Sequence, residues 1–556
     1  MRFVLPLCLV LGCDPTPDSD TDSGGGGESD TDTDTDTDTD TDTDTDPGPF
    51  AFVETFDDAS NLSVGAVDGS GWVRGTALFG LDEDAGDGSD GAYAPTTSDT
   101  LTAGTYQFTS VDLDGVQVGT DGDVTLRISG AFSMTNSARL QSTGALRIVV
   151  DGPFDIGAGS SFFEANGGEL IVDQLSTDGV NMGNVLVRAT TVGAVPADLS
   201  VSSRGSITFD SVQGYNEWDA GATATTRGGD TILCAYGDIV VQNLTRFDTL
   251  GTATAARGTG IWLQSEGDIV VQGTSAFLPD FGPVELRAAG AIRVLDLADV
   301  HSVGGPLDII ADGPVVFDTE ALVRSLPGDG PRPITIRGAS LTMGEYAVLQ
   351  TTNSFSGFPV GEITIEVSGD ATMDLESLII IGDSDCGDGG DVTVRAGGNV
   401  SLTQDSMIYA GEDGGSTCPG VGGDVLIEAG GSIAATGTGG PYILPGAGFT
   451  SPGTVTESPG ASVTVEPDAG VRPTISVESN ALPVNLAGRT ITDVSVGAVD
   501  GLDSWVSVWV DPDGSGTWVA PADAVGQVLV DGWRYRVDLG QRMFDGSGLD
   551  ELSVAY

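Results

Sequence analysis

The sequence predicts an all-β protein in which a parallel β-helix (solenoid) forms most of the chain, with a small C-terminal antiparallel β-sandwich and a disordered acidic N-terminal tether. One observation behind this prediction is a recurring unit of short strand, glycine turn and short strand. Another is the alternation of apolar and polar residues within each unit, which is typical of strands with one wet face. The third is composition, because 83 glycines and 6% aromatic residues suit many short strands joined by tight turns.

The first residues are typical of an export signal. Arg2 is followed by an apolar stretch, residues 3–12, that is far too short to span a bilayer. The letters VLGC at residues 10–13 resemble the lipobox of bacterial lipoproteins. This resemblance implies that residues 1–12 are a signal peptide and that Cys13 becomes a lipidated N-terminus. Ordinary signal-peptide cleavage nearby is the alternative.

Residues 13–48 are expected to form the disordered tether. They contain four consecutive glycines, Gly24 to Gly27, and a Thr-Asp run that ends at Asp46. Because the segment has no apolar surface to bury and its like charges repel, it should stay extended. A calcium site in the Asp run is disfavoured, since the run lacks a glycine turn and a bidentate glutamate to fix a cage.

The charge of the chain limits its partners. There are 82 acidic and 21 basic residues, a formal net charge of −61, and every basic residue is arginine. Because no cationic patch is available to neutralise phosphates, nucleic-acid binding and electrostatic docking onto anionic lipid are both disfavoured. Cations and cationic surfaces are the expected electrostatic partners.

The repeats fill residues 106–440, after an expected N-terminal cap at residues 49–105. The clearest copies are residues 361–373, 389–402 and 422–435. We expect each coil to hydrogen-bond to the next at about 4.8 Å. The turn glycines are 23 to 33 residues apart, which is a solenoid period, and they are Gly237, Gly267, Gly290, Gly313, Gly338, Gly369, Gly398 and Gly431.

The repeat register also predicts a ladder of charges on the outside of the solenoid. Glu366, Arg395 and Glu428 each stand three residues before the turn glycine of successive coils, and Arg287 holds this position two units earlier. Alternating signs avoid repulsion, and each exposed contact should contribute only about 0.2–1 kcal/mol. The same register points Val394 into the core.

These repeats resemble the surface β-helix proteins of the filamentous-haemagglutinin and adhesin type. The Thr-Asp tether and the segment at residues 87–111 are similar to those of a group of large Gram-negative surface lipoproteins. The resemblance implies an exported, membrane-anchored protein of the outer membrane or cell surface. It further implies a structural or adhesive role, with the membrane reached through the lipid anchor and with glycans or other surface proteins as partners.

The end of the chain differs in kind from the repeats. Residues 441–475 are expected to be a linker, and residues 476–556 a β-sandwich similar to carbohydrate-binding or fibronectin-like appendages. The sandwich is predicted from clean alternation and from four of the seven tryptophans, which are Trp505, Trp509, Trp518 and Trp533.

Three cysteines follow Cys13. Cys386 and Cys418 occupy equivalent places in successive repeats, so we expect a disulfide between them and a free thiol at Cys234. Two unpaired buried thiols are the alternative.

Calcium is the one cofactor that the sequence suggests. Asp511, Asp513 and Ser515 form the best candidate site, because alternate oxygens on a glycine turn can converge on a hard cation. The acidic loops at residues 81–91 and 382–391 are weaker candidates. A solvated turn is the alternative at each.

An enzyme is the less favoured function, in the form of a β-helix polysaccharide lyase or hydrolase acting on extracellular glycan. The single histidine, His301, excludes any mechanism that needs two imidazoles and is expected to be structural. The sequence shows no pair of acidic residues with arginine at strand spacing across adjacent coils. Stacked Asp and Arg lining a groove on one sheet would favour an enzyme, and a flat polar sheet would favour adhesion.

Overall fold

The computed structural model describes residues 51–54, 62–64, 85–157, 159, 161–191, 197–218, 229–249, 260–279, 282–326, 333–351, 361–382, 388–403, 405–411, 420–437, 442–448, 450–463, 475–479, 488–498, 506–515, 517–530, 532–539 and 549–555.

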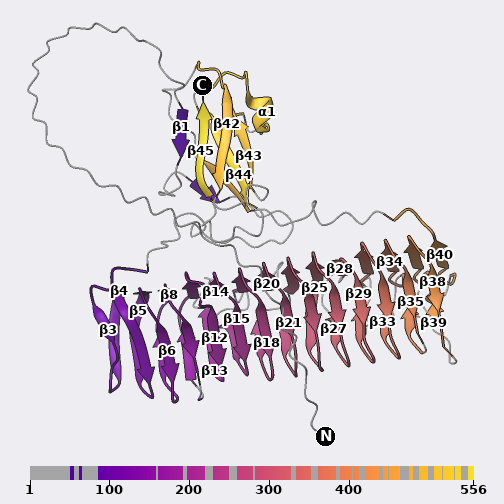
Figure 1. Ribbon diagram of the computed structural model, residues 1–556, viewed down its shortest axis with the longest axis horizontal. Coiled ribbons are helices and arrows are strands. Elements are labelled where there is room, and N and C mark those ends of the chain that lie inside the picture. Colours follow the sequence, from indigo (N-terminus) through magenta and orange to yellow (C-terminus); the bar gives the residue numbers. More distant parts are fainter. Residues whose placement is uncertain are drawn as a thin grey trace, which may run out of the picture. The chain divides into compact units, whose positions relative to one another are not determined.

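A parallel β-solenoid, as predicted, contains most of the described residues. From β3 (Gly91–Tyr93) to β40, 38 described strands belong to one continuous hydrogen-bonded system, and Figure 1 shows them stacked side by side in chain order. Most strands pair in parallel with the strand three before and the strand three after, so the solenoid has three faces. The long strands β4 (Asp99–Asp114), β5 (Gln117–Ile128) and β25 (Asp299–Ala311) each contribute to more than one face.

The remaining solenoid strands divide among the three faces, and β3 extends face B, because it pairs with the part of β4 that also pairs with β6. Face A contains β8 (Leu146–Val150), β11 (Leu170–Gln174), β14 (Leu199–Ser203), β17 (Thr231–Ala235), β20 (Ile261–Ser265), β23 (Gly282–Ala288), β28 (Ile334–Gly338), β31 (Ile363–Val367), β34 (Val392–Ala396), β37 (Val425–Ala429) and β40 (Val455–Pro459). Face B contains β6 (Phe132–Thr135), β9 (Phe154–Ile156), β12 (Val180–Gly183), β15 (Ile207–Asp210), β18 (Ile239–Gln242), β21 (Ile269–Val271), β24 (Ile292–Val294), β26 (Val315–Phe317), β29 (Leu341–Met343), β32 (Ala371–Met373), β35 (Val400–Leu402) and β38 (Ile433–Ala435). Face C contains β7 (Arg139–Ser142), β10 (Ser161–Ala165), β13 (Val185–Thr191), β16 (Gln213–Trp218), β19 (Arg246–Thr249), β22 (Ala276–Pro279), β27 (Leu322–Leu326), β30 (Val348–Thr351), β33 (Leu378–Ile381), β36 (Met407–Tyr409) and β39 (Tyr442–Leu444).

The core of the solenoid is built by alternation. On β34, Val392, Val394 and Ala396 are buried, whereas Thr393 and Arg395 between them are half-exposed. Because equivalent residues of neighbouring coils are direct register partners, each inward column is a continuous apolar stack. The hydrophobic effect along these columns therefore fixes which side of every strand faces inward.

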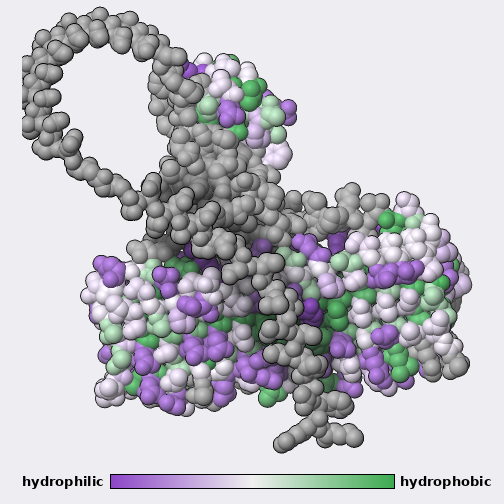
Figure 2. Space-filling view, in the orientation of Figure 1, coloured by the Kyte–Doolittle hydropathy of each residue, from purple (hydrophilic) through white to green (hydrophobic). Residues whose placement is uncertain are grey.

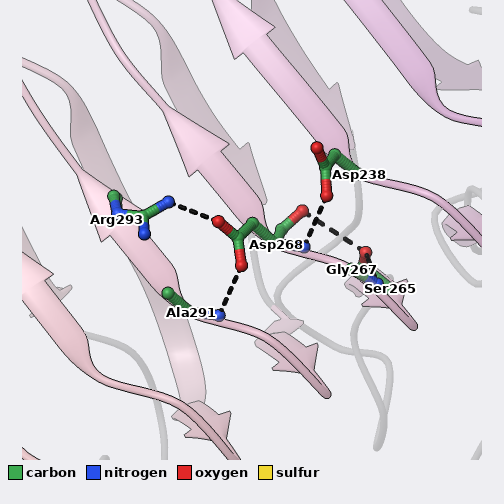
Figure 3. A network of polar contacts seen from close by, with 6 residues as sticks. All are labelled: Asp238, Ser265, Gly267, Asp268, Ala291 and Arg293. Carbon is green, nitrogen blue, oxygen red and sulfur yellow. Dashed lines mark hydrogen bonds and ion pairs between the residues drawn. The ribbon is translucent and has the colours of Figure 1, made fainter. Parts of the chain in front are cut away.

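The glycine turns are closed by side chains from the preceding coil. Asp238 Oδ1 accepts the backbone N–H of Asp268 at 2.8 Å, and Asp268 Oδ1 accepts that of Ala291 at 2.7 Å (Figure 3). Asp268 also pairs with Arg293. A Cβ on Gly267 would lie 2.2 Å from the Asp238 carboxylate, so a side chain there would collide with this ladder. An aspartate or asparagine that follows the turn glycine makes this contact in several coils, as Asp370 and Asn399 also do, and the spacing of the turn glycines alone did not predict it.

The predicted charge ladder is present. Arg395 contacts Glu366 at 3.2 Å and Glu428 at 3.0 Å, and Arg337 adds a further contact to Glu366 at 3.1 Å. The earlier part of the alignment needs correction. The turn after β28 is one residue shorter, so that Gly338 is the register partner of Val367 rather than a turn glycine.

The same column reaches back to Arg287. Its register partners run through Ile310 and Arg337 to Glu366, so Arg287 lies three coils before Glu366 and not two.

Two small antiparallel sheets lie outside the solenoid, as expected for a C-terminal sandwich. One has the order β1 (Ala51–Glu54), β45 (Leu549–Ala555), β42 (Asp493–Ala498). The other has the order β2 (Leu62–Val64), β41 (Ile475–Ser479), β44 (Arg534–Leu539), β43 (Val506–Asp511). The only described helix is the single turn α1 (Pro521–Ala524).

The pairing of β1 and β2 differs from our expectation for residues 49–105. Both strands fall in the range assigned to an N-terminal cap, yet β1 pairs with β45 and β2 pairs with β41. These strands are far apart in the sequence, so no local sequence pattern predicts that they pair. The solenoid is therefore inserted between two segments of the antiparallel sheets.

Candidate functional site

The candidate site is a group of charged side chains on face A. Glu285 and Arg287 project outward from β23, Asp308 projects from β25, and Arg337 projects from β28. Glu285 is the direct register partner of Asp308, so two carboxylates occupy adjacent coils of one column. Arg287 and Arg337 stand in the neighbouring column of the same face. We call these four residues the face A cluster.

The two carboxylates have different environments. Glu285 is only 7% exposed and forms an ion pair with Arg287. Burial, together with repulsion from Glu285, raises the pKa of Asp308 from 3.8 to about 6, although Thr335, Arg287 and Arg337 oppose the shift. Asp308 thus keeps its proton up to about pH 6, beside a second carboxylate that is paired with a guanidinium.

This cluster corrects the expectation that no pair of acidic residues together with arginine occurs at strand spacing across adjacent coils. A signal was present, because the segments Gly282 to Glu285 and Gly305 to Asp308 align as GPVE and GPLD. The alignment places the two carboxylates at one repeat position. It was missed because each acidic residue, taken alone, is ordinary on an outward strand position.

Two further ion pairs lie in the early coils of the solenoid. On face A, Arg147 contacts Asp173 at 3.0 Å. On face C, Arg188 contacts Glu164 at 2.9 Å. In both pairs the carboxylate is buried, so its charge depends on the arginine partner for compensation.

His301 belongs to a small network on face C. Its Nδ1 lies 3.2 Å from Asp299 Oδ1, and Arg324 contacts the other oxygen of Asp299 at 2.6 Å. Burial opposes ionisation of Asp299, but hydrogen bonds from His301 and Arg324 lower its pKa overall. Because the histidine is itself buried and bound to a paired carboxylate, the geometry agrees with a structural role.

The cysteine predictions fall largely outside the described residues. Cys13, Cys386 and Cys418 all lie there, so the lipid site and the disulfide stay predictions. Cys234 is described and lies half-buried on β17, between Ser202 and Gln264 of the neighbouring coils.

The calcium candidate is a tight polar turn after β43. Asp511 is fully buried, and its Oδ2 accepts a hydrogen bond from Arg534 at 2.8 Å. The backbone N–H of Ser515 donates to Asp511 Oδ1 and to Asp513 Oδ1. Hydrogen bonds from Ser515 lower the pKa of Asp513. Both carboxylate oxygens of Asp511 therefore accept hydrogen bonds from the protein itself. A calcium ion at this turn stays a prediction.

Among the described residues, no group of three or more histidine, cysteine or acidic side chains is arranged to hold a metal ion. The described part of the chain also contains no helix long and apolar enough to cross a membrane. Comparisons with protein-family models, with curated proteins and with solved structures found no match.

The face A cluster has the components for two kinds of chemistry. Guanidinium groups beside carboxylates can bind a polar, anionic ligand by hydrogen bonds. A carboxyl that keeps its proton up to about pH 6, next to a second carboxyl group, is also the pairing needed for acid and base steps on a glycosidic bond.

Proposed function

We propose that this protein is an exported cell-surface protein, anchored through a lipid on Cys13, that presents its solenoid to other surfaces or glycans in a structural or adhesive role. The observation that carries the proposal is the uninterrupted parallel stack from β3 to β40. Such a stack gives long outward faces on which side chains repeat at one strand spacing, which suits contact with extended or repetitive partners.

The sequence supports the location assigned in this proposal. The apolar stretch that ends in VLGC and the acidic Thr-Asp run are what an anchored and spaced protein requires. The strongly negative chain favours neutral or cationic partners over nucleic acid. Calcium bound near Asp511 is part of the same proposal.

Cys13→Ser tests the anchor. We expect the variant to lose acyl-lipid labelling and to move from the membrane fraction to the soluble fraction, while the wild type stays with the membrane and is cut by protease added to intact cells. Cys234→Ser is the matched control and should behave as wild type. Labelling that persists in Cys13→Ser would contradict the proposal.

Cleavage of an acidic glycan is the second candidate, and the face A cluster is the observation that favours it. In this reading Asp308 donates a proton to the glycosidic oxygen, Glu285 acts as the second carboxylate, and Arg287 and Arg337 hold the sugar acid groups. The raised pKa of Asp308 supports the proton-donor role, because the group stays protonated up to about pH 6.

Purified wild type, Glu285→Gln and Asp308→Asn should be incubated with polygalacturonate and with alginate. If the cluster is catalytic, new reducing ends appear with the wild type, and each variant lowers the rate by about 100-fold or more. The wild-type rate should fall as pH rises above about 6. Glu428→Gln on the distant ladder is the control. No cleavage of either polymer, or equal cleavage by all four proteins, would count against this candidate.

A further inference from the structure

The outward side chains of face C change character along the solenoid. In the first half, charged residues such as Arg139, Glu164 and Arg188 share these positions with apolar ones such as Phe162 and Leu186. In β27, β30, β33, β36 and β39 they are mostly apolar and form two aligned columns. The first column contains Leu322, Val348, Leu378, Met407 and Tyr442, and the second contains Arg324, Gln350, Ile380, Tyr409 and Leu444. We call the eight apolar members of these columns the apolar strip.

The apolar strip faces outward. The residues that alternate with it, such as Leu349 and Ile379, are buried in the core. The strip itself is half-exposed, and its last members, Tyr442 and Leu444, are 48% and 40% exposed. Figure 2 shows hydrophobic residues interspersed with hydrophilic ones on the visible side of the solenoid.

In the coils of β31 and β34, face A carries polar side chains where face C carries apolar ones. Thr364 and Glu366 of β31 precede β33 in the same coil, and they point outward on face A as a hydroxyl and a charge. One coil later, Thr393 and Arg395 again place a hydroxyl and a charge at the outward positions of face A. A polar outward column is therefore compatible with these coils, so the fold does not require the strip to be apolar. Contiguous apolar surface of this kind marks a contact site.

We propose that the apolar strip is a lateral contact between two copies of this chain. The charge pattern of the strip is compatible with a second copy as its occupant. The outward positions of the five strands carry no acidic side chain, and the one cation, Arg324, is held by Asp299. Two chains of net charge −61 repel each other, and at physiological salt this repulsion acts over about 8 Å, so close contact needs an uncharged surface on both.

The shape of the strip is self-complementary. β33 is the middle strand of the five, so a two-fold axis beside it brings β27 of one copy against β39 of the other. Flat sheet faces pack at about 10 Å, with interdigitated side chains. In this arrangement Arg324 comes against the Tyr442 and Leu444 end of the second copy, where a guanidinium and an aromatic ring attract each other.

The size of the strip predicts the strength of the contact. Five strands at about 4.8 Å spacing make a contact of roughly 20 Å, which covers a few hundred Å² per copy. That is below the ~800 Å² per partner of a stable complex. The association should therefore be weak in dilute solution and should strengthen where copies are held at high local concentration.

Sedimentation of the purified full chain over a wide concentration range tests the proposal. We expect the average mass of the wild type to rise with concentration, and Ile380→Arg to weaken self-association at least tenfold. Thr364→Arg adds the same charge on face A of the same coil and should associate as the wild type does. Ile380→Thr, which places the face A side chain on face C, provides a milder variant if the arginine disturbs folding.

Three results would overturn the proposal. The first is a wild type that stays monomeric throughout. The second is Thr364→Arg weakening association as much as Ile380→Arg does. The third is a monomer that binds phosphatidylcholine vesicles in a manner sensitive to Ile380→Arg, because the strip would then contact lipid instead of a second copy.

Discussion

At the scale of single residues, Asp308 stands out because the fold does not need its charge. Thr335 and Thr364 occupy the same column in the next two coils, so a neutral hydroxyl fits this outward position. Asp308 instead stands beside Glu285, where its charged form is disfavoured. A side chain kept at a cost in stability is a reason to look for function at that place.

Asp308→Asn should stabilise the solenoid at neutral pH by about 1–3 kcal/mol. Because the folded-state pKa of Asp308 is raised from 3.8 to about 6, its stabilising contribution is complete below about pH 4 and is lost as pH rises through about 6. The advantage of the variant should thus be present at pH 7 and absent at pH 4. Denaturant unfolding of both proteins across this range measures it, and Asp312→Asn, at an exposed position nearby, is the control.

At the scale of strands, the ladder on β28, β31, β34 and β37 shows how outward side chains report register. The ion pairs join direct register partners on neighbouring coils, and positive and negative side chains alternate from one coil to the next. Since the arginine of β34 is 43% exposed, its contacts are screened by water and salt, and they stabilise the stack only modestly.

A double-mutant cycle of Arg395→Ala and Glu428→Ala should give a coupling free energy of about 0.2–1 kcal/mol that shrinks in high salt. The contact distance of 3.0 Å is the reason to expect coupling. The matched cycle of Arg337→Ala and Glu428→Ala joins residues three coils apart and should be additive. Equal coupling in both cycles would mean that the ladder does not act through its contacts.

At the scale of the whole molecule, strands that precede the solenoid pair with strands that follow it in the antiparallel sheets. β45 is the central strand between β1 and β42, so both depend on it for their hydrogen bonds. The tether that we expect before residue 49 therefore leads first into these sheets, and the solenoid follows as an insertion.

Deletion of residues 549–556 should remove hydrogen-exchange protection from residues 51–54 and 493–498, because it takes away their pairing partner. The amides of β31 and β34 are an internal reference and should keep their protection, since their coils pair only with each other and with neighbouring coils. Loss of protection in both regions would show that the solenoid needs the antiparallel sheets in order to fold.

The sequence by itself determined the solenoid, its inward columns and the ladder around Arg395. These features follow from period-two alternation and from glycines that recur at each turn, and both are local patterns. Only the tertiary structure decided that Glu285 meets Asp308, that face C carries an apolar strip, and that β1 and β2 pair with the C-terminal strands. Each of these features depends on which residues of distant segments become neighbours. Coils of unequal length, such as the one with the short turn at Gly338, shift the register between coils without changing the local alternation of apolar and polar residues.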